Sequence, residues 1–165
     1  IMDLADYTLL GYLEKYPNLD INIRKSIAKQ VLCGFKYLHS KGLLHRDIAY
    51  NNVLIFVYED ALVVKISDLG LVKKKQSDLT RTGTEIKGTL ADPSLSEDGF
   101  KNYSMCHEIY ALTRLIYFIM TNRKTLGRYS NDSIEEFVRN GTNLDRSARY
   151  KNDMEILAAF NNVSW

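Results

Sequence analysis

The sequence predicts a mainly helical fold that contains one small β-hairpin. Five segments have the apolar spacing of helices, whereas only two short runs are rich in the residues that favour strands. Between the hairpin and the next helix lies a long polar stretch with no sustained period, and such a stretch inside a compact domain is usually functional. The chain has 165 residues, of which 45% are hydrophobic, and this size fits one domain with its own core.

The charge balance and the apolar runs do not indicate a nucleic-acid or membrane partner. The net charge is only +2, which does not favour a nucleic-acid partner. The longest apolar run, residues 115–120, is far too short to cross a bilayer. We therefore expect no nucleic acid and no membrane within this segment, and a cytoplasmic location by default.

Two helices are predicted in the first forty residues. Residues 6–16 have helical spacing, and Pro17 ends that helix because proline cannot continue it. Residues 22–40 carry apolar side chains about every four positions, which places them on one helix face packed on a core. These side chains are Ile23, Ile27, Val31, Phe35 and Leu38.

A hairpin and three helices are predicted in the rest of the chain. Residues 52–58 and 62–66 are rich in Val, Ile and Tyr and form the two strands of the hairpin. Residues 104–121 are apolar nearly all round, so this helix is expected to be central and buried. Residues 133–140 and 152–163 give two further helices.

Five polar residues stand at a spacing that has a chemical reason. His45-Arg46-Asp47 is followed by Asn52, five residues after Asp47, and sixteen residues later by Asp68-Leu69-Gly70. Phosphoryl transfer needs one carboxylate that accepts or orients the proton of an attacking hydroxyl. It also needs an amide and a second carboxylate that together hold a magnesium ion.

This pattern resembles the catalytic loop and the metal loop of the eukaryotic-type protein kinases, and the order of elements resembles their C-terminal lobe. The resemblance is strongest from residue 45 to residue 121. It implies a protein-kinase-like C-terminal lobe over 1–165, in which the small β-hairpin carries the catalytic and metal loops. The hinge would be 1–7, the catalytic loop 45–52 and the activation segment 68–94.

The family's N-terminal lobe has no counterpart before residue 1. Its Gly-rich loop, strand lysine and partner glutamate cover and hold the nucleotide phosphates in the family. The resemblance therefore implies an expression fragment or a truncated product, whose parent protein supplies its own N-lobe. We expect little or no activity from these 165 residues alone.

The resemblance also implies roles for individual residues. Asp47 would be the catalytic base, and Asn52 and Asp68 would hold Mg²⁺ on the phosphates of ATP. Leu54 would form the apolar floor under the adenine. It could also simply be an inward-facing strand residue, and both interpretations can hold. Leu69 would be an apolar plug with His45 packed beneath it.

Regulation and substrate contact would come from the activation segment. A phosphorylated residue there would pair with Arg46, the arginine before the catalytic aspartate. Glu85 stands where the family often carries the phosphorylated residue, so it would supply a permanent negative charge, with Thr84 or Thr82 as the regulated alternative. Thr89, after Gly88, would face the substrate.

The chain departs from the family pattern in three places. Ala49 replaces the lysine that touches the transferred phosphate in serine/threonine kinases. The activation segment ends in Asp92-Pro93-Ser94 instead of the family's Ala-Pro-Glu, whose glutamate pairs with an arginine near the end of the chain. No matching arginine stands beyond residue 152, so we expect both partners of this ion pair to be lost together. Glu108 replaces the aspartate that holds the catalytic loop, or else it is an ordinary acid at a helix start.

Three functions remain open. The first is a divergent protein kinase that uses ATP and Mg²⁺ on a protein hydroxyl, with Ser/Thr favoured and a bacterial-type enzyme as one option. The second is a pseudokinase-like module that binds a protein partner. The third is a small-molecule phosphotransferase with the kinase fold, although these usually have Gly where this chain has Arg46.

Overall fold

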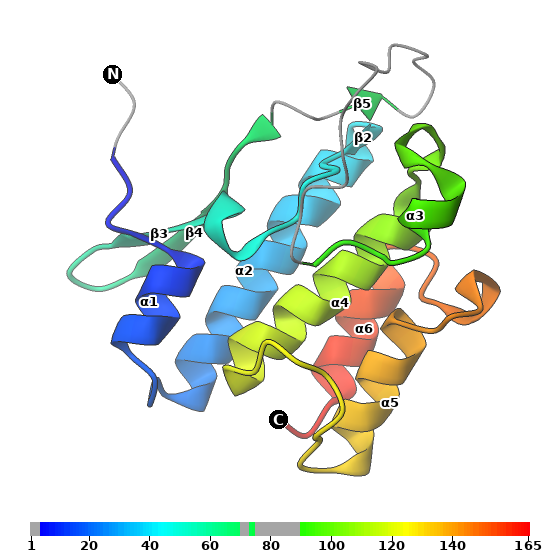
Figure 1. Cartoon of the computed structure of the whole chain (residues 1–165). Coiled ribbons are helices and arrows are strands. Elements are labelled where there is room, and N and C mark those ends of the chain that lie inside the picture. Colours follow the sequence, from blue (N-terminus) through cyan, green and yellow to red (C-terminus); the bar gives the residue numbers. More distant parts are fainter. Residues whose placement is uncertain (1–3, 70–72, 75–89) are drawn as a thin grey trace.

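The computed structural model describes residues 4–69, 73–74 and 90–165. Helices α2 (Ile21–Ser40) and α4 (Met105–Thr121) run side by side through the middle of the molecule (Figure 1). A three-stranded sheet packs against α2 on one side, and α5 (Asp132–Gly141) and α6 (Asp153–Asn162) pack on the other. The predicted mainly helical fold with one small hairpin is confirmed.

The two central helices form because their apolar faces are buried against each other. On α2, Ile27, Val31 and Phe35 are almost completely buried, as the four-residue spacing predicts. The Asp20 side chain accepts a hydrogen bond of 2.8 Å from Asn22 N and caps the helix start. Helix α4 is buried on nearly all sides, so it forms the centre of the lobe.

The first helix is shorter than predicted. Helix α1 spans Leu9–Lys15, and the two residues before it form strand β1 (Tyr7–Thr8). The backbone of Thr8 is extended, and its Oγ1 accepts a hydrogen bond of 3.1 Å from Gly11 N. An N-cap of this kind fixes the first helical residue at Leu9, so the prediction of a helix from residue 6 was wrong.

The predicted hairpin consists of β3 (Val53–Val57) and β4 (Leu62–Ile66). It pairs antiparallel from Val57 opposite Leu62 to Val53 opposite Ile66, and β1 pairs with the other edge of β3. The side chain of Gln30 on α2 covers the outer edge of β4. It donates to Leu62 O and accepts from Val64 N, both at 3.0 Å.

Several short elements lie in segments for which the sequence predicted no regular structure. Strand β2 (Leu43–Leu44), just before the catalytic loop, pairs antiparallel with β5 (Lys73–Lys74). Helix α3 (Leu95–Asp98) is followed by a 3₁₀ helix over Phe100–Asn102. A segment of two to four residues is too short to show a period, which is why the sequence did not predict them.

The last two helices match their predicted bounds within one residue. Gly141 at the end of α5 lies so close to α4 that an added Cβ would be 2.0 Å from Thr113 Oγ1. Only glycine permits this approach. Two further 3₁₀ turns lie at Tyr50–Asn52 and Arg146–Ala148.

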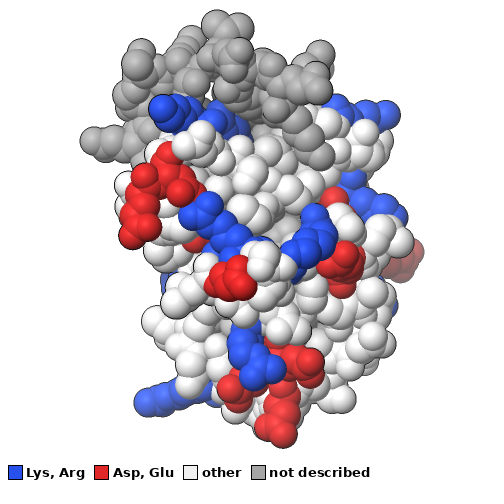
Figure 2. All heavy atoms as spheres, turned by 90° about the vertical axis from the view of Figure 1, so that its right-hand side faces the viewer, with Lys and Arg blue, Asp and Glu red and all other residues white. Residues whose placement is uncertain are grey.

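The face that carries α3 and α5 shows acidic and basic side chains interspersed among uncharged ones (Figure 2). No helix in the described ranges has both the length and the apolar content that a bilayer span requires.

Candidate functional site

The predicted catalytic loop, residues 45–52, lies between β2 and β3, and hydrogen bonds of His45 hold it. The ring of His45 is completely buried. Its Nε2 donates to the Ser67 carbonyl at 2.9 Å, and its Nδ1 accepts from Asp47 N at 3.3 Å. Both bonds are made when the ring proton is on Nε2. His45 is therefore packed as predicted, and it links the loop to the chain beside Asp68.

Asp47 and Asn52 are in direct contact. Asn52 Nδ2 donates to the Asp47 carbonyl at 2.8 Å and to its side-chain Oδ2 at 3.1 Å. The 3₁₀ turn over Tyr50–Asn52 returns the chain so that these side chains meet. Because the amide nitrogen points at Asp47, Asn52 Oδ1 is the atom that could ligate a cation.

Asp68 joins this pair through its neighbour in the chain. Ser67 donates from its backbone N at 2.8 Å and from its hydroxyl at 3.1 Å to the carbonyl of Asn52. Asp68 itself is exposed and has a φ of 57°, a left-handed conformation that turns the chain after β4. Leu69 is 52% exposed, and because it stands at the edge of the described residues, its role as an apolar plug stays a prediction.

Asn52 and Asp68 offer oxygen atoms, the type of ligand that could hold a magnesium ion. Among the described residues, no group of three or more His, Cys, Asp and Glu side chains could hold a metal ion. Mg²⁺ is commonly bound by only one or two carboxylates, with water and substrate phosphates completing the shell. The amide oxygen of Asn52 and the carboxylate of Asp68 fit that pattern.

The remaining predicted residues divide into two groups. Leu54 lies on β3 between Thr8 and Lys65 and is half-buried. The structure places it in a strand, as both of its interpretations required. Four others lie outside the described residues, and their roles stay predictions: Thr82, Thr84, Glu85 and Thr89.

Glu108 on α4 holds the catalytic loop. Its carboxylate is completely buried, and Oε1 accepts from the backbone N of Arg46 at 2.8 Å. The same oxygen accepts from the hydroxyl of Tyr103 at 2.6 Å, while Oε2 contacts His39 Nε2 at 3.1 Å. The longer side chain thus does what was expected of the family's aspartate, and the interpretation as a simple helix-start acid was wrong.

His39 extends this network to α6. Its Nδ1 lies 2.7 Å from Asp153 Oδ1, so the ring bridges two carboxylates. Burial alone would lower the pKa of His39, but hydrogen bonds to Asp153 and Glu108 raise it to about 9. Burial would raise the pKa of Glu108, but the bonds from His39, Tyr103 and the backbone of Arg46 lower it. The network therefore pairs a cation with carboxylates inside the lobe.

The side chain of Arg46 is engaged within the described residues. The residue is only 9% exposed, and its Nη2 donates to the Phe100 carbonyl at 2.6 Å. Its guanidinium carbon lies 4.1 Å from the centre of the Phe100 ring and 5.6 Å from that of Tyr103. The φ of Arg46 is 72°, which lets its backbone face Glu108 while its side chain faces Phe100.

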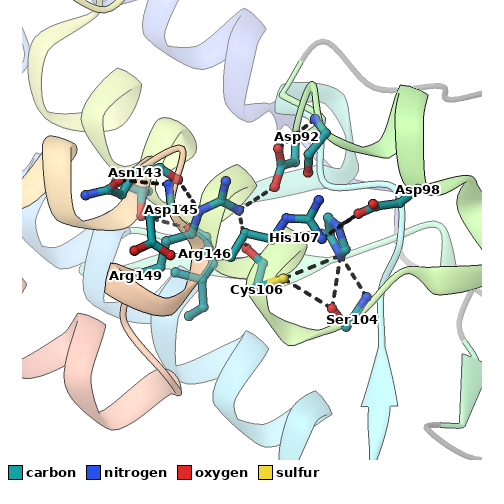
Figure 3. A network of polar contacts seen from close by, with 12 residues as sticks. Asp92, Asp98, Ser104, Cys106, His107, Asn143, Asp145, Arg146 and Arg149 are labelled. Carbon is teal, nitrogen blue, oxygen red and sulfur yellow. Dashed lines mark hydrogen bonds and ion pairs between the residues drawn. The ribbon is translucent and has the colours of Figure 1, made fainter.

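The segment end is anchored by an ion pair that was expected to be lost. Asp92 and Arg149 are 2% and 3% exposed, and Asp92 Oδ2 is bonded to Arg149 Nη1 (Figure 3). Burial would raise the pKa of Asp92, but Arg149 and Ser94 lower it. The expectation of joint loss was wrong because the carboxylate is at the first position of the altered motif and the arginine stands before residue 152.

The same region holds a second, more exposed pair. Asp98 Oδ2 contacts Arg146 Nη1, and it also lies 3.4 Å from His107 Nε2 (Figure 3). Arg149 Nε additionally donates to the Asn143 carbonyl at 2.7 Å. The turn before α6 is thereby bonded to both ends of the 92–98 segment.

Sequence reasoning missed His39, Tyr103 and Arg149. A signal existed for His39, because it continues the four-residue spacing of Val31 and Phe35 toward the core. Arg149 and Tyr103 stand in irregular segments, where no period indicates which way a side chain points.

The comparisons with known proteins agree with this geometry. A family model described as the protein kinase domain matches residues 1–161. The chain is 30% identical over 150 residues to the serine/threonine-protein kinase RAD53 of Saccharomyces cerevisiae, covering 81% of this chain and 18% of that protein. It is 27% identical over 127 residues to a probable serine/threonine-protein kinase of Encephalitozoon cuniculi, covering 75% and 22%.

A third relative is the cysteine-rich receptor-like protein kinase 10 of rice, at 31% identity over 135 residues, 79% of this chain and 20% of that protein. The chain therefore spans about a fifth of the length of the relatives that it matches. With the domain match over nearly all of its residues and the catalytic loop folded around Asp47, the chain belongs to the protein kinase family.

Proposed function

We propose that the parent protein transfers the γ-phosphoryl group of Mg²⁺-ATP to a protein hydroxyl, with serine or threonine favoured. The observation that carries the proposal is the contact of Asn52 with both the carbonyl and the carboxylate of Asp47. The bonds from Ser67 to Asn52 support it, because they hold Asp68 next to the same site.

In this mechanism Asp47 orients the substrate hydroxyl and accepts its proton as the new O–P bond forms and the bond to ADP breaks. Asn52 Oδ1 and the Asp68 carboxylate would hold the magnesium ion. When bound, that ion would neutralise charge on the β- and γ-phosphates. His45 and Glu108 keep the loop rigid, so that these groups need little rearrangement.

Nucleotide and substrate contacts complete the proposal. Leu54 would pack under the adenine, and an N-lobe of the parent would close over the phosphates next to the hinge at 1–7. Thr89 would face the substrate. Serine or threonine is favoured because two of the relatives reported above are named serine/threonine-protein kinases.

Ala49 favours a second candidate, a pseudokinase-like module that binds a protein partner. Loss of the lysine that neutralises transferred charge should slow transfer unless another cation takes its place. The intact Asp47, Asn52 and Asp68 favour catalysis.

The test is phosphorylation by the full-length parent with γ-labelled ATP and Mg²⁺. Wild type is compared with Asp47→Asn and with Asp60→Asn, the same change in the exposed hairpin loop. We expect label on Ser or Thr that falls about 10²- to 10⁴-fold in Asp47→Asn and is unchanged in Asp60→Asn.

Other outcomes would redirect the proposal. No label from any of the three folded proteins would favour the binding module, and label only on small alcohols or aminoglycosides would favour a small-molecule phosphotransferase. We also propose that residues 1–165 alone are inactive, and turnover by the isolated chain would contradict this.

A further inference from the structure

The turn that precedes α4 encloses the side chain of Arg46. The Phe100 carbonyl accepts a hydrogen bond of 2.6 Å from Nη2, and the Phe100 ring lies 4.1 Å from the guanidinium carbon. Tyr103 adds a second ring at 5.6 Å, and the two rings lie 5.6 Å apart. We call residues 100–103 the arginine clamp.

The arginine clamp also reaches the backbone of the catalytic loop. The Tyr103 hydroxyl donates to Glu108 Oε1, the oxygen that accepts the backbone N–H of Arg46. Burial and the neighbouring Glu108 raise the pKa of Tyr103 well above its usual value, so this hydroxyl keeps its proton and remains a donor. One turn thus holds both the main chain and the side chain of the residue before Asp47.

These contacts give the Arg46 cation an internal set of partners. A buried charge is costly unless it is paired or hydrogen-bonded. The carbonyl dipole and the negative faces of the two rings supply that compensation, and a desolvated cation–π contact is worth up to about 2 kcal/mol or more. All of these partners come from residues 100–103, so the clamp compensates the guanidinium without any group from the activation segment.

We propose that the arginine clamp positions Asp47 in place of a phosphate, so that activity does not require phosphorylation of the activation segment. Phe100 and Tyr103 are then positioning residues, and Thr82, Thr84 and Glu85 are not needed to engage Arg46. The proposal rests on the kinase function proposed above.

The first experiment removes phosphate from the full-length parent. The protein is treated with a broad-specificity phosphatase, its complete dephosphorylation is checked by mass spectrometry, and its rate is compared with that of a mock-treated sample. We expect the two rates to agree within about twofold. A loss of tenfold or more that returns on rephosphorylation at Thr82 or Thr84 would overturn the proposal.

The second experiment breaks the clamp. Phe100→Leu removes the ring but keeps the carbonyl, Phe100→Tyr keeps the ring, and Tyr37→Leu removes an exposed ring that lies 5.1 Å from Lys41 Nζ. We expect kcat to fall about tenfold in Phe100→Leu, with an unchanged KM for ATP. Phe100→Tyr should restore it, and Tyr37→Leu should have no effect.

The same Phe100→Leu change in an Arg46→Met background tests whether the ring acts through Arg46. We expect no further loss of kcat there, because the cation is already gone. An equal tenfold loss in both backgrounds would refute the clamp.

Equilibrium unfolding measures the contact between Phe100 and Arg46 without relying on kinase activity. The effects of Phe100→Leu and Arg46→Met on the unfolding constant should be non-additive by about tenfold. A parent that transfers no phosphate would refute the proposed function but leave this coupling intact. Additive effects would refute the clamp itself.

Discussion

Two buried carboxylates hold this lobe together in different ways. Glu108 is shared by donors from three parts of the chain, namely His39 on α2, Arg46 in the catalytic loop and Tyr103 before α4. Asp92 has one charged partner, Arg149, and a bond from the backbone of Ser94. One carboxylate is therefore the centre of a network, and the other is half of a pair.

The two carboxylates should respond differently when one of their hydrogen-bond partners is removed. A carboxylate with several donors keeps most of its compensation when one donor is removed. A buried carboxylate with one cation is left uncompensated, which is the costly case. We therefore expect the pair to be the more fragile of the two, although the network lies closer to the catalytic loop.

The largest expected effect is on the pair. Arg149→Met should lower the free energy of unfolding by about 3–5 kcal/mol, because it leaves Asp92 buried and charged. Denaturant unfolding measures it. The double variant Asp92→Asn with Arg149→Met should be clearly more stable than the single one. Equal destabilisation would mean that the lost packing of Arg149, not the stranded charge, sets the cost.

The next effect is the dependence of stability on pH. The folded pKa of His39 is about 9, above the ordinary value of 6.5, so its contribution is fully present below pH 6.5 and is lost as the pH rises through 9. That contribution is about 3 kcal/mol at most. Urea unfolding at pH 6.5 and pH 9.5 should show the loss in wild type and a flatter profile in His39→Gln. The same profile in both proteins would contradict the assignment.

A smaller effect is expected at the centre of the network. Glu108→Gln keeps an acceptor for Arg46 N and Tyr103 but turns an amide N–H₂ toward His39, so it should cost about 2 kcal/mol. The full-length parent should also lose kcat, because the catalytic loop loosens. If Glu108→Gln destabilises more than Arg149→Met, the contrast between network and pair is wrong.

The smallest effect belongs to an exposed pair that serves as a reference. Lys124 Nζ lies 3.4 Å from Glu14 Oε1, and both side chains are more than half exposed. Lys124→Ala should change the free energy of unfolding by less than about 0.5 kcal/mol. A larger change would show that charge in general, rather than buried charge, stabilises the lobe.

The sequence predicted the parts of the fold that rest on regular spacing. Helices α2 and α4 and the hairpin followed from apolar periods, and Asp47, Asn52 and Asp68 followed from a motif with fixed chemistry. The partners of Asp92 and Arg46 come from irregular segments that tertiary packing brings together. Neither periodicity nor motif spacing carries that information, so Arg149, Phe100 and Tyr103 required the structure.

The bonds of Gln30 to β4 have a consequence for self-association. An open sheet edge offers backbone groups to which a strand of another molecule can pair. Leu62 O and Val64 N point away from β3, and the Gln30 amide occupies both, as one residue of a neighbouring strand would. A second chain would have to displace this amide before it could extend the sheet. A helix residue thereby protects the lobe against edge-to-edge aggregation.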